Sequence, residues 1–281
     1  MHIVQIVPFL GPDTGVPGVA WNLDRELRAL GVTVESFTFD TARQGRPFYY
    51  PTTGIRGRLA RMRRIVWFRF AGTRRARRYL AARPDAISIC HSEALAGDIF
   101  VDHGSMLQAM RAAGHPMWRI LANPIQPLSY LHERARFRGR VHHMIVTLTG
   151  RGEVDLVRLY GRVQPPVVTI PNGVDTERFK PPAQAERAHL RREYSLDDED
   201  RVALFVGHDL PGKGIQHAVA ALVHAPTVLL LVVGGVAATV DSARTLADSL
   251  GVSERVLFVG PRQDVERFFA LADMFLSLIH I

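Results

Sequence analysis

The chain has 281 residues, of which 47% are hydrophobic and 22% are charged. These values are typical of a globular protein with about two domains, and they exclude a mainly disordered or collagen-like chain. A single cysteine, Cys90, excludes a disulfide framework and a zinc site built from several cysteines. No apolar run approaches the roughly 18 residues of a membrane helix, and the first residues do not form a signal sequence, so we expect a cytoplasmic protein.

The net charge of +8 arises from one segment. Between Thr41 and Pro84 the sequence has 13 arginines and no acidic residue, whereas the rest of the chain has 22 basic and 27 acidic residues. Only two of the 35 basic residues are lysines, Lys180 and Lys213. The sequence therefore describes a mildly acidic body with one arginine-rich segment.

The first half of the sequence alternates strand-like and helix-like segments. A β-rich run over His2–Val7 is followed by a glycine-containing loop and by apolar residues at helical spacing over Val19–Leu30. Further strands are predicted over 32–39, 86–90, 99–102, 144–149 and 167–170, and further helices over 55–70, 74–82 and 152–160.

A polar, helical stretch over 181–200 separates this half from a second alternation. There we predict strands over 202–206, 227–233 and 255–259, and helices over 215–224, 242–250 and 265–271. Strands that alternate with helices imply parallel sheets with crossover helices. The sequence therefore predicts an α/β fold with two Rossmann-like domains, whose ligands would bind at the loops that follow the strands.

The loop from Gly207 to Gly214 follows a predicted strand and precedes a predicted helix. Backbone N–H groups at a helix start attract phosphate, and Lys213 would add a full positive charge. The loop approaches the pattern of phosphate-loop nucleoside triphosphatases, but Gly214 stands where these proteins need a hydroxyl for Mg²⁺. The pattern therefore favours a phosphate contact over a triphosphatase; the alternative is a glycine-rich turn with a solvated lysine.

Three other places in the sequence carry weaker signals. Gly15, after the first strand, would let a phosphate or sugar approach the backbone, although a tight turn explains this residue equally simply. His103, at a strand end, could donate a hydrogen bond to a ligand or be an ordinary satisfied polar residue. His142 and His143 have no third ligand at a suitable spacing, so we expect no metal site.

The arginine-rich segment has an amphipathic pattern. Apolar residues at 55, 59, 62, 66 and 70 follow helical spacing, and the other faces carry Arg56, Arg58, Arg61, Arg63 and Arg64. A basic helix with aromatic residues fits peripheral contact with an anionic membrane surface. A core-packed helix with solvated arginines fits as well, and nucleic acid is favoured less than either.

Several segments together resemble the retaining family 4 glycosyltransferases, whose GT-B fold has two Rossmann-like domains that face each other across a cleft. The most specific match is 168–179, VTIPNGVDTERF, which resembles the family's inter-domain segment. Residues 204–215, LFVGHDLPGKGI, are similar to its phosphate-binding strand and loop. Residues 250–260 with 272–275 are similar to the stretch before the donor-sugar site, and 14–30 resemble the N-terminal glycine loop and helix. The resemblance covers nearly the whole chain, is strong in its second half and is looser from residue 41 to 140.

The resemblance implies roles for residues that could bind the donor. Lys213 and Gly207 match the part of the family pattern that contacts the donor diphosphate. His208 stands where the family has an arginine and would serve as a second cation. Gly15 matches the backbone that approaches the donor phosphate.

The resemblance also implies a domain organisation. Residues 1–166 would form the acceptor-side domain, with His103 as its active-site histidine, and 167–281 the nucleotide-sugar-binding domain. Asn172 and Gly173 would shape the hinge of the cleft, or form a purely structural turn.

By resemblance, the protein would transfer a sugar from a nucleotide diphosphate sugar to an acceptor hydroxyl with retention of configuration and without a metal or other cofactor. The process would be cell-envelope polysaccharide, lipopolysaccharide or glycolipid synthesis. The arginine-rich segment would hold an anionic or lipid-linked acceptor, or the inner face of the membrane that carries it.

The sequence departs from the family pattern at its end. After Ala272 and Asp273 the family continues with glutamates that contact the donor sugar and ribose, whereas this chain stops at Ile281 without them. We therefore expect a truncated second domain. The alternative function is a nucleotide-sugar-binding fragment without turnover.

Overall fold

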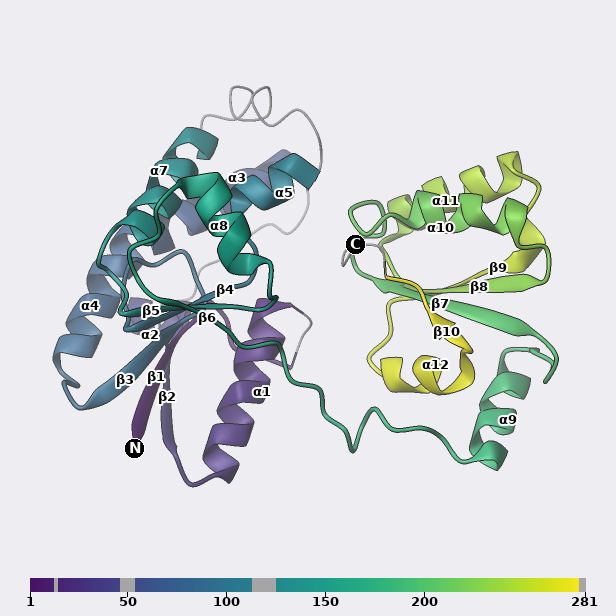
Figure 1. The fold of residues 1–281 in the computed structure, drawn as a ribbon, viewed down its shortest axis with the longest axis horizontal. Helices are drawn as coiled ribbons and strands as arrows, with labels where there is room; N and C mark the ends of the chain where they lie inside the picture. Colours follow the sequence, from purple (N-terminus) through teal and green to yellow (C-terminus); the bar gives the residue numbers. More distant parts are fainter. Residues whose placement is uncertain (13–14, 46–53, 113–124, 278–281) are drawn as a thin grey trace. The chain divides into compact units, whose positions relative to one another are not determined.

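The structure, a computed structural model, describes residues 1–12, 15–45, 54–112 and 125–277 (Figure 1). The chain forms two compact units, Met1–Asn172 and Gly173–Ile281. Each unit is built on a parallel sheet with helices packed against it, so the predicted α/β class with two Rossmann-like domains is confirmed. Thr14 and the last four residues of the chain lie outside the described residues.

The sheet of the first unit has the order β2-β1-β3-β4-β5-β6, and all its neighbouring strands are parallel. In parallel sheets of this kind the loops after the strands gather at one edge. The strands are β1 (His2–Ile6), β2 (Thr33–Phe37), β3 (Ala86–Cys90), β4 (Ile99–Asp102), β5 (Met144–Thr147) and β6 (Val167–Thr169).

Helices cover both faces of this sheet. Val4 and Ile6 of β1 point to one face, where they join a buried core with residues of α4 (Thr73–Ala81), α7 (Ile125–Arg138) and α8 (Gly152–Tyr160). Gln5 points to the other face, where its Nε2 donates a hydrogen bond of 3.1 Å to the carbonyl of Ala20 in α1. The remaining helices of the unit are α1 (Val16–Ala29), α2 (Phe39–Arg43), α3 (Gly54–Trp67) and α5 (Met106–Ala112).

Residues 54–81 of the arginine-rich segment form one long, interrupted helix. α3 continues through a π-helical turn, η1 (Phe68–Gly72), into α4. Phe68 is buried, and its ring centroid lies 5.7 Å from that of Phe39, which the Trp67 ring also approaches at 4.9 Å. Phe70, by contrast, is 51% exposed. The helix is therefore packed on the core at Trp67 and Phe68 and open to its surroundings two residues later.

The sheet of the second unit has the order β10-β7-β8-β9, again with parallel neighbours. α10 and α11 lie on one face and α9 and α12 on the other (Figure 1). β7 and β8 are apolar because both of their faces are buried under helices. The elements are β7 (Arg201–Gly207), β8 (Val228–Gly234), β9 (Val256–Gly260), β10 (Met274–Phe275), α9 (Gln184–Glu193), α10 (Ile215–Ala221), α11 (Ala237–Ser249), α12 (Val265–Leu271) and the 3₁₀ turns η2 (Leu222–His224) and η3 (Ser253–Arg255).

The structure differs from the sequence-based expectation in three respects. The units divide after Asn172 and not after residue 166, because β6 pairs with β5 in the first sheet. α2, α5, α7 and β10 were not predicted, and α11 begins at Ala237, before the expected start at 242.

Candidate functional site

The loop between β7 and α10 has the geometry of a turn that presents a lysine at the end of a strand. Lys213 Nζ lies 3.4 Å from the carbonyl oxygen of Val206, near the carboxyl end of β7. The backbone of the turn is closed by hydrogen bonds from Lys213 N to Asp209 O at 3.1 Å and from Ile215 N to Leu210 O at 3.0 Å. The ammonium group is therefore held at the strand end by a fixed backbone.

Gly207 is a glycine for a steric reason. A Cβ at this position would lie 2.7 Å from Lys213 Cδ, so a larger residue would displace the lysine side chain. Gly234, the last residue of β8, and Gly235, which follows it, pack against the same point: a Cβ on Gly234 would clash with Gly207 O, and Gly235 N donates a 2.9 Å hydrogen bond to that oxygen. The edge of the sheet is thus formed by bare backbone beside a single ammonium group.

The other predicted donor residues lie at loops of the same type. His208 follows Gly207 and is exposed. Gly15 precedes α1 with a φ of 82°, a conformation that glycine adopts without strain, and its carbonyl accepts a hydrogen bond from Val19 N at 3.1 Å. In the first turn of this 14-residue helix Pro17 has no N–H and Val19 N already donates to Gly15 O, so an anion would be bound by the backbone N–H groups of Val16 and Gly18.

His103 directly follows β4 and forms a pair with a histidine that the sequence analysis missed. β3 and β4 are parallel neighbours, so the residues that follow them lie at one edge of the sheet. His91 Nδ1 lies 3.0 Å from His103 Nε2, and the ring centroids are 5.3 Å apart. His91 is 5% exposed, whereas His103 is partly exposed. The sequence feature that could have identified His91 as a site residue is its position directly after a buried strand.

Burial sets the protonation of this site. Burial, and then the charge of His103, lowers the pKa of His91 to about 3, and burial also lowers the pKa of His103. Both rings are therefore neutral at neutral pH. Burial raises the pKa of Asp102 to about 6, although the Gly104 N–H, 3.1 Å from its Oδ1, favours the carboxylate.

A buried arginine fixes the loop that carries His91. Arg136 Nη2 donates hydrogen bonds of 2.9 Å to the carbonyls of Ser92 and Ala94, and its guanidinium lies 3.9 Å from the centroid of the Phe100 ring. Arg136 is 4% exposed. This contact joins α7 to the loop after β3 and was not expected from the sequence.

The proposed hinge residues lie at the division between the units. Asn172 ends the first unit and Gly173 begins the second, and both are exposed. The segment is then fixed by Asp175, whose Oδ1 accepts hydrogen bonds of 3.1 Å from the backbone N–H groups of Glu177 and Arg178.

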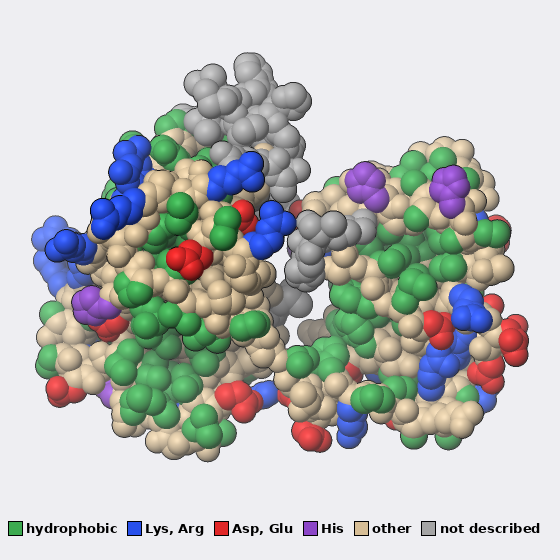
Figure 2. Space-filling model, viewed as in Figure 1, with side chains coloured by type: hydrophobic (Ala, Val, Ile, Leu, Met, Phe, Trp, Pro, Cys, Tyr) green, Lys and Arg blue, Asp and Glu red, His purple; other side chains and the backbone are tan. Residues whose placement is uncertain are grey.

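Of the five arginines predicted as a patch, all lie on α3, and three have described side chains. Arg56 and Arg63 are exposed, and the guanidinium of Arg64 lies 4.5 Å from the centroid of the Phe9 ring. Nothing is described for the side chains of Arg58 and Arg61. Basic side chains also gather where α4 and α7 lie (Figure 2), with exposed arginines at 74, 75, 77, 78, 134 and 138.

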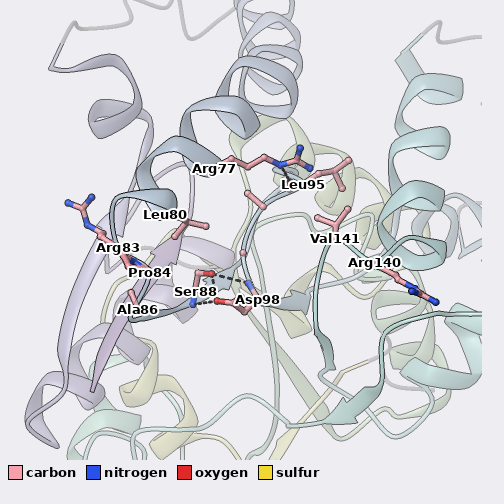
Figure 3. A pocket seen from close by; sticks show the side chains of 12 residues that line it. Arg77, Leu80, Arg83, Pro84, Ala86, Ser88, Leu95, Asp98, Arg140 and Val141 are labelled. Carbon is pink, nitrogen blue, oxygen red and sulfur yellow. Dashed lines mark hydrogen bonds between the residues drawn. The ribbon is translucent and has the colours of Figure 1, made fainter.

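A cavity of about 590 Å³ lies at the opposite edge of the first sheet, by the amino ends of β3, β4 and β5 (Figure 3). Its wall includes Arg77, Arg83 and Asp98. Asp98 accepts hydrogen bonds from Ser88 N and Oγ at 2.8 and 2.6 Å, and Arg83 is paired with Glu35 at 2.9 Å. The carboxylate of Asp98 and the guanidinium of Arg83 thus each have a partner already. The cavity is separate from the loops that follow the strands.

Within the described ranges, no three His, Cys, Asp or Glu side chains are grouped so that they could hold a metal ion. In the same part of the chain, no helix has both the length and the apolar character needed to cross a bilayer.

Two family models match the chain. Residues 14–178 match Glycosyltransferase Family 4, and residues 186–280 match Glycosyl transferases group 1. Among curated proteins, D-inositol 3-phosphate glycosyltransferase of Mycobacterium sp. (strain KMS) is 35% identical over 125 residues, which are 42% of this chain and 28% of that protein. The GDP-mannose-dependent alpha-(1-6)-phosphatidylinositol monomannoside mannosyltransferase of Mycolicibacterium smegmatis is 34% identical over 112 residues, 38% of this chain and 28% of that protein. The matched part thus spans less than a third of these relatives.

Solved structures share the fold over most of this chain. WaaG, a glycosyltransferase involved in lipopolysaccharide biosynthesis, has a TM-score of 0.71 at 19% identity, with 98% of this chain and 74% of that chain covered. Sucrose-phosphate synthase from Thermosynechococcus elongatus has a TM-score of 0.67 at 18% identity, with the same coverage. Anabaena Alr3699/HepE in complex with UDP and glucose has a TM-score of 0.60 at 15% identity, covering 97% of this chain and 73% of that chain.

These likenesses agree with the two parallel sheets described above and identify the fold as GT-B. The family 4 model covers more than half of the sequence, from the loop before α1 to the segment after β6. The chain therefore belongs to glycosyltransferase family 4.

Proposed function

We propose that the protein transfers a sugar from a nucleotide diphosphate sugar to an acceptor hydroxyl, with retention of configuration and without a metal. Family 4 glycosyltransferases use nucleotide-sugar donors. The observation that carries the proposal is the ammonium group of Lys213 at the end of β7, beside the bare backbone of Gly207 and Gly234.

Departure of the diphosphate is the step that these residues would assist. When the bond between the sugar carbon and the diphosphate oxygen breaks, negative charge grows on that oxygen, and a fixed positive group nearby stabilises it. In the second unit, Lys213 would supply a full charge and His208 a further donor. In the first unit, the first turn of α1 after Gly15 would offer backbone N–H groups to a phosphate in its own right. The acceptor oxygen forms the new bond to the sugar carbon as the bond to the diphosphate breaks, and the proton of the acceptor hydroxyl passes to the departing diphosphate oxygen.

His103, which belongs to the first unit, would contact the sugar of the donor. Its ring is neutral, partly exposed and held by His91, so it would bind a sugar oxygen through a hydrogen bond and not through charge. Asn172 and Gly173, at the division between the units, would serve as the hinge.

The acceptor would be anionic or lipid-linked, and the protein would act in cell-envelope polysaccharide, lipopolysaccharide or glycolipid synthesis at the cytoplasmic face of the membrane. The names of two curated relatives contain D-inositol 3-phosphate and phosphatidylinositol monomannoside. The exposed arginines on α3, α4 and α7 are suited to such a phosphate or to an anionic bilayer.

Liposome flotation tests the membrane contact. Arg56→Glu with Arg63→Glu should abolish flotation with vesicles that contain anionic lipid, because both arginines are exposed on α3. The matched control, Arg158→Glu with Arg162→Glu, makes the same charge change at exposed positions outside this helix. Equal flotation of both double variants would contradict the assignment.

Transfer from labelled UDP- and GDP-sugars tests the reaction itself. The chain is incubated with each donor and a membrane lipid extract, and the anomeric configuration of any product is determined by NMR. Retention in the product supports the proposal. Binding of a nucleotide sugar without transfer favours the alternative function, a nucleotide-sugar-binding fragment, and binding of neither donor contradicts both.

A further inference from the structure

The two histidines at the ends of β3 and β4 can share one proton. The hydrogen bond joins His91 Nδ1 and His103 Nε2 at 3.0 Å, so one of these nitrogens carries the proton and the other accepts it. Each neutral ring carries one proton, on either Nδ1 or Nε2. The ring that donates this hydrogen bond has its proton on the bonded nitrogen, and the ring that accepts has its proton on the other nitrogen.

The surroundings of His91 distinguish the two arrangements. His91 Nε2 is buried and has no hydrogen-bond partner among the described residues. If His103 donated the shared proton, His91 would carry its proton on Nε2, as a buried N–H without an acceptor. If His91 donates from Nδ1, its Nε2 is an unprotonated nitrogen and leaves no orphaned N–H. Unpaired buried N–H groups are rarer in proteins than unpaired acceptors, so the second arrangement is favoured.

This arrangement determines the tautomer of His103, the partly exposed ring of the pair. With Nε2 accepting from His91, His103 carries its proton on Nδ1, so that atom donates and does not accept. We propose that His91 is a positioning residue that fixes His103 as the Nδ1–H tautomer, ready to donate a hydrogen bond to a sugar hydroxyl of the donor. The ligand part of this inference rests on the proposed function, whereas the tautomer does not. It assigns His103 the role of hydrogen-bond donor and excludes Nδ1 as a general base.

The rigidity of the pair supports this assignment. Arg136 ties down the loop after His91 through the carbonyls of Ser92 and Ala94. His91 itself is almost fully buried, so its ring cannot reorient towards solvent to find another partner. A fixed donor atom on a fixed ring is what positioning of a second histidine requires.

Nitrogen NMR of the 281-residue chain, labelled with ¹⁵N-histidine, tests the tautomer directly. The His103 signals are assigned by their loss in His103→Gln. We expect Nδ1 to show the shift of a protonated nitrogen and Nε2 that of an unprotonated one. In His91→Phe, which keeps a ring but removes the donor, His103 should change to an exchanging mixture of both tautomers. His189→Phe, at an exposed histidine on α9, should leave the His103 signals unchanged.

The outcomes separate the inference from the proposed function. Protonation of His103 at Nε2 in the wild type, or an unchanged tautomer in His91→Phe, would overturn the inference; should His91→Phe not fold, His91→Leu gives the same comparison. In the folded variant, calorimetry should find UDP affinity within twofold of wild type, while the gain in affinity from UDP to UDP-sugar is lost. If the NMR result holds but no nucleotide binds, the proposed function fails and the positioning role of His91 stands.

Discussion

Replacement of Lys213 by methionine tests the donor-binding loop most directly. Lys213→Met keeps most of the side-chain volume and removes the charge at the carboxyl end of β7. Within the described residues, the ammonium group donates one hydrogen bond, a long one of 3.4 Å to Val206 O. Its removal should therefore cost little stability, and the effect should appear in the binding of a diphosphate.

The expected loss follows from the strength of a charged hydrogen bond. A hydrogen bond to a charged group contributes about 1.5–3 kcal/mol, and each 1.4 kcal/mol changes a dissociation constant about tenfold. Lys213→Met should therefore weaken the binding of UDP or GDP by roughly 10- to 150-fold. The binding of the uncharged nucleoside should not change.

Isothermal titration calorimetry at low salt measures these affinities, since salt screens exposed charges. UDP, GDP, uridine and guanosine are titrated into the wild type, Lys213→Met and Lys180→Met. Lys180 is the other lysine of the chain, is exposed, and provides a control with the same change in charge. A change of less than twofold for Lys213→Met, or an equal loss in Lys180→Met, would refute the assignment of this lysine to the diphosphate.

Three further changes probe the site and its support. Gly207→Ala should weaken UDP binding about tenfold without a change in charge, because its Cβ would displace Lys213, and calorimetry again measures this. His142→Gln should reduce acid sensitivity by the share of this one group. Burial lowers the pKa of His142 to about 4, so the wild type loses about 2 kcal/mol of stability from His142 between pH 7.5 and pH 5, as the unfolded chain binds a proton. Arg136→Met should lower the free energy of unfolding by about 2–4 kcal/mol, because two buried carbonyls lose their donor, and urea titration measures both stability effects.

Control variants at nearby positions test these predictions. Gly150→Ala adds a methyl group at an exposed position where nothing lies within 4 Å and should leave UDP binding unchanged. Arg138→Met alters an exposed arginine on the same helix as Arg136 and should change stability by less than about 0.5 kcal/mol. If His142→Gln lost as much stability towards pH 5 as the wild type, the buried neutral state of His142 would be wrong.

The strands and most helices were predictable because apolar spacing follows secondary structure. α7 was not predictable, since its buried face carries polar residues that interrupt the apolar pattern: Ser129, His132 and Arg136. Ser129 accepts a 2.7 Å hydrogen bond from the buried Arg69, so the polar groups satisfy one another across two helices. Such pairing depends on tertiary contacts that spacing along the chain does not reveal.

The candidate site was predictable where one loop contains all its parts and not where two loops meet. Gly207 and Lys213 lie in one turn, and their spacing was sufficient to bring them together. The contact between His91 and His103 depends on the pairing of β3 with β4, and the contact of Gly207 with Gly234 on the pairing of β7 with β8. Sequence alone could place each of these residues after a strand but could not identify its partner.

α4 follows the π-helical turn at Phe68–Gly72 and is itself a regular α-helix, so its length decides which of its residues face the core. Each residue of an α-helix turns the chain by about 100°, so deletion of Arg74 or Arg75 would rotate the rest of α4 against the residues before the deletion by about that angle. The fully buried position of Ala76 would then pass to Arg77. Substitution of an exposed arginine leaves the core intact, whereas such a deletion would place a guanidinium in it. The core under α4 therefore tolerates changes in the composition of this surface better than changes in its length.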